Sequence, residues 1–423
     1  MLYDNSQLVR VYLHAWQLTG NEFFRTITEE ILDYVMREML DPQGGFYSTQ
    51  DADSQGKEGK FFVWTPDEIG DVLGDEADEF IDAYGVTGHG NASTGSAHGF
   101  EGKNILEFAG DLEQRPALTE ARRKLFEARE KRIHPGRDEK VLTSWNSLML
   151  AAFTEVARAL DRDDGSRALA ASYREVTERN ADFLLRELRQ ENGRLLRTWK
   201  SNPEVSERPG EAKLNGYLED YSYLIEGLLE LYQTTFDPHW FVAAQELAET
   251  MLEHFVGSDG TLYDTSDDHE TLITRPRDLQ DNATPSGNAM AVTTLLKLAS
   301  FTNELRYVDI AEQALAQIQP MMAQYPLGFG QWLQALAYAL SKPREVAIVG
   351  DPESAETQAL LSVARDGYRP FQVMALGAPD WDKTIPLLQD RGLADGQPAA
   401  YVCRDFACQA PVVEPEGLWV LLA

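Results

Sequence analysis

The chain is poor in cysteine and has no long apolar run, and each deficit excludes a class of protein. Only Cys403 and Cys408 occur among the 423 residues, which is too few for the disulfide framework of a small secreted domain. Their four-residue gap differs from the C-x-x-C spacing of a thioredoxin-type site, so we interpret them as structural cysteines. No stretch of about 18 apolar residues is present, and we expect no membrane-spanning helix. The start, MLYDNSQLVR, lacks the features of a signal peptide, so we predict a cytoplasmic protein.

Basic residues are also scarce. Asp and Glu total 69 against 38 Lys and Arg, which gives a formal net charge of −31. Such a surface repels nucleic-acid phosphates and anionic lipids, so we expect neither nucleic acid nor membrane as a partner. The acidic residues are spread along the chain, and Lys is scarcer than Arg. We hypothesise a halophilic source, in which a carboxylated surface stays soluble in concentrated salt; an ordinary acidic cytosolic protein is the alternative.

Metal and cofactor motifs are missing as well. No two histidines have the spacing of a zinc-ligand pair, and the seven are His14, His89, His98, His134, His239, His254 and His269. Asp51–Gly59 resembles a calcium loop, but Phe62 stands where a bidentate Glu is needed, so an acidic hairpin tip is the preferred interpretation. No phosphate-binding loop, dinucleotide fingerprint or nucleophile elbow occurs. We therefore predict no metal and no cofactor.

What the sequence does contain is a set of apolar helices with polar beginnings. In Leu142–Ala152, LTSWNSLMLAA, Thr143 or Ser144 can cap a helix, and the apolar run that follows predicts a helix buried on most faces. Leu218–Tyr232 and Ala283–Ser300 repeat this design. We therefore expect a ring of inner helices that share one functional rim.

The order of the expected elements favours a toroid of helical hairpins. Residues 3–39 form one hairpin, and later helices are expected near 144–160, 166–187, 219–235, 238–255, 286–301, 304–324 and 330–340. Long polar segments separate these helices, including the glycine-rich loop 85–102 and a hairpin-like stretch at 257–281. Residues 45–64 predict two short strands around a polar tip, and two further helices are expected near 66–84 and 118–132. The irregular spacing argues against TPR or HEAT repeats.

The pattern changes near residue 342. β-branched runs at Glu345–Gly350, Gln372–Leu376 and Ala399–Cys403 predict buried strands, with a helix at 353–366. We therefore predict a mainly α protein with two domains, an (α/α) toroid over 1–341 and a small α/β appendage over 342–423.

Several motifs together resemble one known family. In chain order they are MLYDN (1–5), GGFYSTQDADSQGKEGKFFVWT (44–65), KVLTSWNSLM (140–149), LEDYSYLIEGLLELY (218–232), ATPSGNAMA (283–291) and YVCRDFACQAPV (401–412). The chain resembles the family of bacterial YyaL and animal spermatogenesis-associated protein 20, which joins a thioredoxin-like domain to an (α/α)6 barrel. That barrel is in turn similar to N-acylglucosamine 2-epimerases and six-hairpin glycosidases, a likeness at the level of fold.

The resemblance also implies that this chain matches only part of a family member. In the family, the MLYDN motif lies well inside the barrel, so the match covers the barrel and the C-terminal part without the thioredoxin-like domain. The toroid is then expected to lack its first hairpin. Apolar flanks left exposed in this way predict pairing with a second copy or association with a thioredoxin-like domain.

The resemblance implies a carbohydrate-processing function, in which carboxylates divide acid and base roles. Rim candidates are Asp4, Asp51, Asp53, Glu219, Asp220 and Asp281. We predict Asp220, Asp4 and Asp53 as catalytic, and Asp220 first, because it opens an inner helix among tyrosines. The alternative for Asp220 and Asp4 is a first-turn acid that complements the helix dipole.

Sugar-binding residues are expected at the same helix starts. Trp145 could stack on a sugar ring, and Asn146 and Tyr221 could bond its hydroxyls. Ser286 and Asn288, in TPSGN, could bind a hydroxyl or an anion at a helix start. Packing and capping are the alternatives. The histidine pair of the epimerases finds no matching positions, so a non-catalytic ligand-binding or interaction module is the second functional hypothesis.

Overall fold

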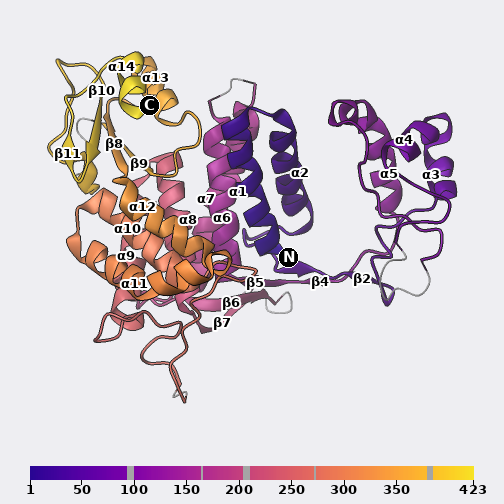
Figure 1. The fold of residues 1–423 in the computed structure, drawn as a ribbon, viewed down its shortest axis with the longest axis horizontal. Coiled ribbons are helices and arrows are strands. Elements are labelled where there is room, and N and C mark those ends of the chain that lie inside the picture. The colour runs from indigo at the N-terminus through magenta and orange to yellow at the C-terminus, as the bar shows by residue number, and fades with distance from the viewer. Residues whose placement is uncertain (93–99, 163–164, 203–209, 271–272, 379–383) are drawn as a thin grey trace. The chain divides into compact units, whose positions relative to one another are not determined.

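The computed structural model describes residues 1–92, 100–162, 165–202, 210–270, 273–378 and 384–423 (Figure 1). Contacts divide the chain into two compact units, and each is described separately. The first contains Met1–Ser48 and Lys140–Ala423, and the second contains Thr49–Glu139. Within the described residues, no helix combines the length and the apolar character needed to cross a membrane.

The first unit is built from helical hairpins. Their short links carry standard signals: Gly20, in the left-handed conformation, ends one helix, and Asn21 caps the next. Asp237 caps a helix that has Pro238 at its first position. The hairpins are α1 (Leu2–Thr19) with α2 (Glu22–Glu38), α6 (Thr143–Leu160) with α7 (Arg167–Phe183), α8 (Leu218–Thr235) with α9 (Pro238–Phe255), and α10 (Gly287–Thr302) with α11 (Leu305–Gln324). A single helix, α12 (Gly330–Ser341), follows.

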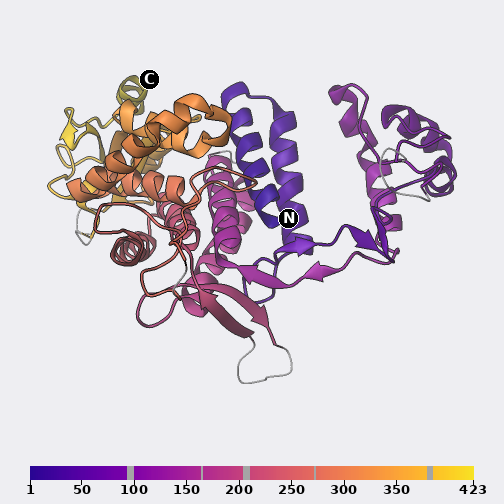
Figure 2. The same cartoon turned by 60° about the horizontal axis from the view of Figure 1, so that its bottom comes forward.

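One helix of each hairpin is an inner helix. The inner helices α1, α6, α8, α10 and α12 pack side by side in that order, and α2, α7, α9 and α11 each cover one of them (Figures 1 and 2). α6, α8 and α10 are buried along almost their whole length. Gly227 allows α8 to approach α6, because a Cβ there would lie 3.0 Å from the Leu150 side chain and 3.1 Å from the Ser147 carbonyl oxygen. The predicted toroid-type helical fold is confirmed.

The C-terminal segment is α/β, as predicted. Its elements are β8 (Arg344–Val349), α13 (Ala355–Ala364), β9 (Gln372–Gly377), β10 (Ala399–Arg404), β11 (Ala407–Cys408) and α14 (Pro415–Leu422). The sheet order is β11-β10-β8-β9, with β8 and β9 parallel and the other pairs antiparallel. This segment belongs to the first unit: the Met374 N–H donates to Gln233 of α8 at 3.0 Å. A domain boundary at 342 stays a prediction.

A three-stranded antiparallel sheet leads into α6. It contains β5 (Lys140–Leu142), β6 (Leu196–Ser201) and β7 (Gly210–Asn215). Its hairpin, β6–β7, extends beneath the helices in Figure 2. The expected helix near 166–187 ends in a short π-helical segment, η3 (Leu184–Leu188). The hairpin-like stretch expected at 257–281 forms no regular strand among its described residues, but an antiparallel bridge joins Val256 to Leu262 at its start.

The second unit contains short elements. β1 (Thr49–Gln50) pairs with β4 (Arg137–Asp138), and β2 (Asp53–Ser54) with β3 (Lys57–Glu58), the predicted hairpin tip. The helices are α3 (Pro66–Leu73), η1 (Gly74–Glu76), α4 (Ala77–Ala83), η2 (Leu112–Leu118) and α5 (Thr119–Arg129). The single helix expected near 66–84 was wrong, because Gly74 adopts a positive φ of 57° and breaks it. Part of the predicted loop 85–102, including His98, lies outside the described residues.

Candidate functional site

Charged side chains interrupt the apolar inner helices at one level. They are Arg10 and His14 of α1, Glu155 and Arg158 of α6, Glu226 and Glu230 of α8, and Lys297 of α10. We call these seven residues the charged network. The carboxylates are nearly inaccessible to solvent, with the Glu226 side chain only 4% exposed. Buried charges in such helices persist only when they are paired, so their contacts decide what they can do.

The contacts run from helix to helix. His14 Nε2 lies 3.0 Å from Glu155 Oε2. Arg10 forms a two-pronged contact with Glu155, at 2.6 and 3.2 Å, and its Nη2 also lies 3.2 Å from Glu226 Oε1. This part of the network joins α1 to both α6 and α8.

The second half of the network centres on Lys297. Its ammonium donates to Glu226 Oε1 and to Glu230 Oε1, both at 2.8 Å. Arg158 Nη2 donates to Glu230 Oε2 at 2.6 Å. Glu226 Oε2 is buried and has no hydrogen-bond partner among the described residues. Acids and bases therefore alternate across four inner helices, and one carboxylate oxygen is left free.

The cations keep the carboxylates ionised. Burial by itself would raise the pKa of Glu155, but Arg10 and His14 outweigh it and hold that pKa well below its ordinary value. Burial likewise opposes ionisation of Glu230, yet Lys297 and Arg158 lower its pKa to about 2. Burial would lower the pKa of Lys297, but Glu226 and Glu230 raise it. Glu155, Glu230 and Lys297 are thus held in their charged forms at neutral pH.

The charged network lines a cavity of about 700 Å³ in the first unit. The inner helices form much of its wall, and residues 367–372 of the C-terminal segment contribute another part. There the Tyr368 ring packs on His14, with 4.3 Å between ring centroids. Exposed lining residues lie on α1, at Val11, and around α12, at Leu327 and Gln334. The cavity therefore opens to solvent between these two helices.

Asp220, the first-choice catalytic residue, is fully buried and does not line this cavity. Its carboxylate accepts hydrogen bonds from the backbone N–H groups of Tyr217, at 2.8 Å, and Ser144, at 2.9 Å, and from Arg197 at 3.2 Å. It therefore caps α8 and also binds the start of α6. Burial raises its pKa to about 7, although Arg197 favours the ionised form. Its catalytic role stays a prediction, and its contacts are those of the capping alternative.

Asp4 and Asp53, the other two residues predicted as catalytic, have contacts of their own. Asp4 is about half exposed and pairs with the amino group of Met1 at 3.2 Å. Asp53 lies in the second unit, exposed on the β2–β3 hairpin, and its N–H donates to Asp51 at 3.2 Å. Their predicted catalytic roles remain untested, and neither residue lines the cavity described above.

The predicted sugar-binding residues lie at the starts of the inner helices. Asn146 is fully buried and bonds the backbone of Phe46 through both its oxygen and its nitrogen. The Tyr221 hydroxyl accepts from the Leu195 N–H at 2.8 Å. Both side chains therefore join backbone segments, and a binding role for them stays a prediction.

The other three helix-start residues have similar surroundings. Trp145 packs edge-on against Tyr3, with 4.7 Å between ring centroids. Ser286 caps α10, and Asn288 donates to Asp264 at 2.8 Å. None of the predicted catalytic or sugar-binding residues lines the cavity, although their neighbours Leu148 and Met290 do, and so does the rim candidate Asp281.

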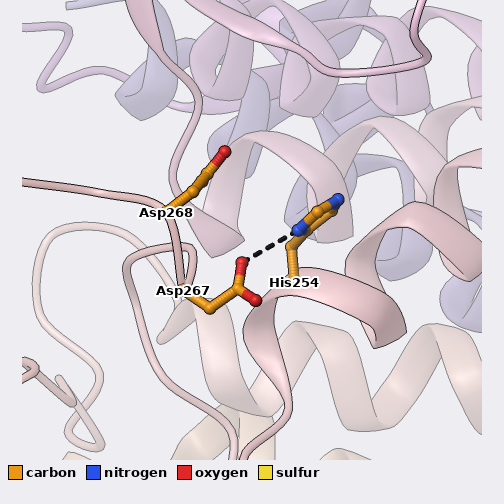
Figure 3. A group of neighbouring side chains, drawn as sticks. All are labelled: His254, Asp267 and Asp268. Carbon is orange, nitrogen blue, oxygen red and sulfur yellow. Dashed lines mark hydrogen bonds and ion pairs between the residues drawn. The ribbon is translucent and has the colours of Figure 1, made fainter.

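Within the part of the chain that the structure describes, two groups of side chains have the spacing of metal ligands. Glu155, Glu226 and Glu230 form one group, but its cations already occupy the space between the carboxylates. Figure 3 shows the other, at the end of α9, where His254 contacts Asp267 at 2.9 Å. Asp268 beside them is bound by both terminal nitrogens of Arg194, which lowers its pKa. Cations thus contact all three carboxylates of the first group, and Arg194 binds Asp268 of the second.

The sequence contains a signal for the charged network that motif-based reasoning missed. Glu226 and Glu230 stand four residues apart inside LIEGLLELY, on one face of an otherwise apolar helix. Glu155 and Lys297 likewise interrupt apolar runs. A charge inside a buried helix needs a partner, so these residues could have been recognised as an interior site.

Comparisons with known proteins identify relatives of the chain. No family model matches it. Spermatogenesis-associated protein 20 of Homo sapiens and of Mus musculus are each 30% identical to it over 459 aligned residues. These alignments cover 100% of the chain and 57% of each relative. A Caenorhabditis elegans protein is 27% identical, with 97% of this chain and 59% of that protein covered.

Solved structures give a weaker likeness. A C. acetobutylicum glycoside hydrolase from family 105 has a TM-score of 0.36 at 11% identity, over 74% of this chain and 76% of that one. Cellobiose 2-epimerase from Bacillus thermoamylovorans has a TM-score of 0.35 at 12% identity, over 74% and 72%. These scores say nothing about the reaction of this chain. The chain is therefore similar to spermatogenesis-associated protein 20 along its whole length, and it spans 57% of the length of that protein.

Proposed function

We propose that the first unit binds and processes a small carbohydrate in the cavity lined by the charged network. The observation that supports this best is the cavity itself. Its volume of about 700 Å³ lies within the roughly 300–1,000 Å³ of small-molecule sites. Its lining combines charged hydrogen-bonding groups with the rings of Tyr338, Tyr368 and Phe371. A sugar presents both hydroxyl groups and apolar ring faces, and this lining suits both.

His14 is the proposed acid–base residue. It lines the cavity, and Glu155 bonds its Nε2 while Tyr368 packs on the ring. Its Nδ1 has no hydrogen-bond partner among the described residues. A histidine held in this way by a carboxylate is suited to accept and donate a proton. The proposed reaction is proton transfer at a carbon beside a sugar carbonyl, as in an epimerase or isomerase.

The carboxylates support this reaction over glycoside hydrolysis. A glycosidase needs a carboxylic acid with a raised pKa, beside a second carboxylate. The cations instead lower the pKa of Glu155 and that of Glu230, so both remain ionised. Asp220 has a raised pKa but does not line the cavity. Asp281, a rim candidate that does line the cavity, accepts hydrogen bonds from the Ser286 and Gln331 N–H groups at 2.7 and 2.8 Å. The predicted catalytic residues Asp220, Asp4 and Asp53 are therefore not part of the proposed mechanism.

Binding without turnover is the second candidate function. The pairing of the buried carboxylates favours this function, because Glu155, Glu226 and Glu230 each contact at least one cation. A network whose charges satisfy one another can fix a binding site without taking part in chemistry.

Deuterium exchange distinguishes these candidates. We expect the protein, incubated in D₂O with a panel of reducing mono- and disaccharides, to exchange the C2 proton of one sugar class, as followed by proton NMR. His14→Gln is expected to slow this exchange by at least about 100-fold, the usual contribution of a general acid–base residue. His239→Gln is the matched control, because His239 is exposed at the start of α9 and does not line the cavity.

Equal exchange by the wild-type protein and His14→Gln would refute the assignment of His14. Sugar binding without exchange would favour the second candidate. If no sugar bound or reacted, the carbohydrate proposal itself would be wrong.

A further inference from the structure

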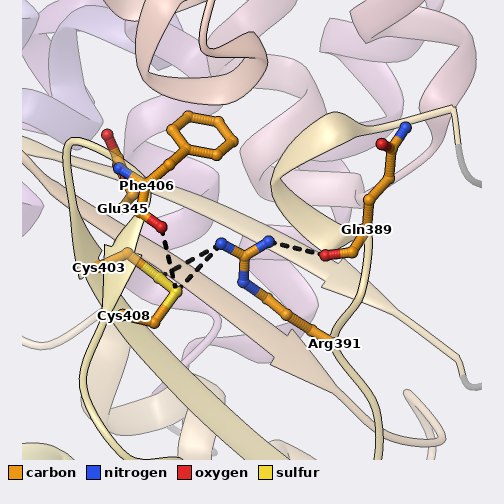
Figure 4. Close-up of a disulfide and its surroundings, with 6 residues drawn as sticks. All are labelled: Glu345, Gln389, Arg391, Cys403, Phe406 and Cys408. Carbon is orange, nitrogen blue, oxygen red and sulfur yellow. Dashed lines mark hydrogen bonds between the residues drawn. A yellow bond between two sulfur atoms is a disulfide. The ribbon is translucent and has the colours of Figure 1, made fainter.

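The two cysteines form a disulfide that joins β10 to β11. Cys403 and Cys408 stand opposite each other in this antiparallel pair and are bonded through their sulfur atoms (Figure 4). Cys403 is fully buried, whereas Cys408 is exposed. An external thiol can therefore reach the bond from the side of Cys408.

A guanidinium group faces this bond. Arg391 Nη2 lies 3.1 Å from Cys408 Sγ and 3.5 Å from Cys403 Sγ, and Nη1 donates to the Gln389 carbonyl at 2.9 Å (Figure 4). Among the described residues, no carboxylate forms an ion pair with Arg391, although Glu345 and Asp390 are near enough to act on its charge. A cation has little to gain from a neutral disulfide, but it stabilises a thiolate strongly.

The hairpin keeps the two cysteines together independently of their bond. Backbone pairing joins Cys403 to Cys408 and Arg404 to Ala407. The Phe406 N–H, in the turn, donates to Glu345 Oε2 of β8 at 2.8 Å. Once the sulfur–sulfur bond is broken, these contacts still hold the two sulfurs face to face. Breaking the bond should therefore be reversible.

We propose that Cys403–Cys408 is a thiol–disulfide exchange site for a dithiol reductant, with Arg391 stabilising the released thiolate. One thiolate of the reductant attacks the exposed Cys408 Sγ, and the electron pair of the broken bond passes to Cys403 Sγ. The second thiol of the reductant then attacks the mixed disulfide, which releases Cys408 and leaves the reductant as a disulfide. Two electrons and two protons pass from the dithiol to the protein. This differs from the interpretation of the pair as structural cysteines, which relied on spacing alone.

Reduction kinetics test the role of Arg391. The full-length protein is mixed with dithiothreitol, quenched with acid, alkylated after denaturation and analysed by mass spectrometry. We expect Arg391→Gln to be reduced about tenfold more slowly than the wild type, the effect of losing one hydrogen bond to a charged group. Arg391→Lys, which keeps the charge, is expected to lie between the two. Arg404→Gln is the matched control, because Arg404 is exposed on the same hairpin and no sulfur contact is present there.

The position of attack is tested with glutathione, a monothiol. Brief treatment, acid quenching and peptide mapping are expected to give glutathione on Cys408 and a free thiol at Cys403. Glutathione mainly on Cys403 would overturn the proposal. Equal reduction rates for the wild type, Arg391→Gln and Arg391→Lys would also overturn it, provided that circular dichroism shows all of these proteins to be folded.

Discussion

Replacing Lys297 with methionine is expected to lower the free energy of unfolding by about 3–5 kcal/mol at pH 7, the usual cost of removing one partner from a buried ion pair. Methionine keeps most of the volume of the side chain, so the loss of charge dominates. Glu226 and Glu230 would then share a buried space without the ammonium that contacts both at 2.8 Å. Urea denaturation of the wild type and the variant measures the difference.

The stability lost in Lys297→Met is expected to decrease as the pH falls. The folded state depresses the pKa of Glu230 to about 2, from an ordinary value of 4.5. The stability that this ionisation contributes is fully present above about pH 4.5 and is lost as the pH falls toward 2. The gap between the wild type and Lys297→Met should therefore shrink in acid, as protonation neutralises the carboxylates.

An exposed ion pair gives the control for Lys297. Arg306 contacts Glu249 at 2.6 Å on the surface, and exposed pairs contribute about 0–1 kcal/mol. Arg306→Met should therefore cost less than about 1 kcal/mol. If Lys297→Met lost no more stability than Arg306→Met, the charges of the network would not depend on one another as buried ion pairs do.

The second large effect concerns Asp220 and pH. Its folded-state pKa of about 7 lies well above its ordinary value of 3.8, chiefly because it is buried. Between about pH 4 and 7 the folded state holds a proton that the unfolded state has released, so wild-type stability falls as the pH rises. At about 1.4 kcal/mol per pKa unit, this contribution reaches up to about 4 kcal/mol.

Asp220→Asn isolates this contribution, because asparagine does not titrate. The free energy of unfolding of the wild type minus that of the variant should decrease from pH 4 to pH 7 and then level off. Other groups with shifted pKa values, such as Asp264 and Glu345, are common to both proteins and cancel in this difference. A difference that stayed constant, or that grew with pH, would show that Asp220 is ionised throughout.

Sequence patterns were sufficient for most of the fold. Helix α9 has the bounds that we predicted, Pro238–Phe255, because Asp237 supplies the cap and Pro238 the first turn. The inner helices were predictable because their apolar residues cover every face. Helix α14 was not predicted, since its eight residues, PEGLWVLL, are too short to show a helical period.

The site was harder to predict because its contacts are distant in sequence. Arg10 and Glu155 are 145 residues apart, and only the packing of α1 on α6 brings them together. The choice of Asp220 shows the converse difficulty: an acid in the first turn of an inner helix has the same sequence signature whether it faces a ligand or caps the helix. Its contacts with Tyr217 and Ser144 became evident only once α6 and α8 were placed side by side.

The central claim, that the cavity beside the charged network holds a carbohydrate, is tested most directly by thermal melts with a panel of sugars and amino sugars. A ligand that binds only the folded state at 100 times its Kd stabilises it by about 2.7 kcal/mol. We predict that one sugar class raises the Tm of the wild type and of Tyr325→Ala, an exposed residue that does not line the cavity. Tyr368→Ala, which removes a ring from the cavity wall, should reduce that rise. No rise with any sugar, or an equal rise in Tyr368→Ala, would contradict the claim.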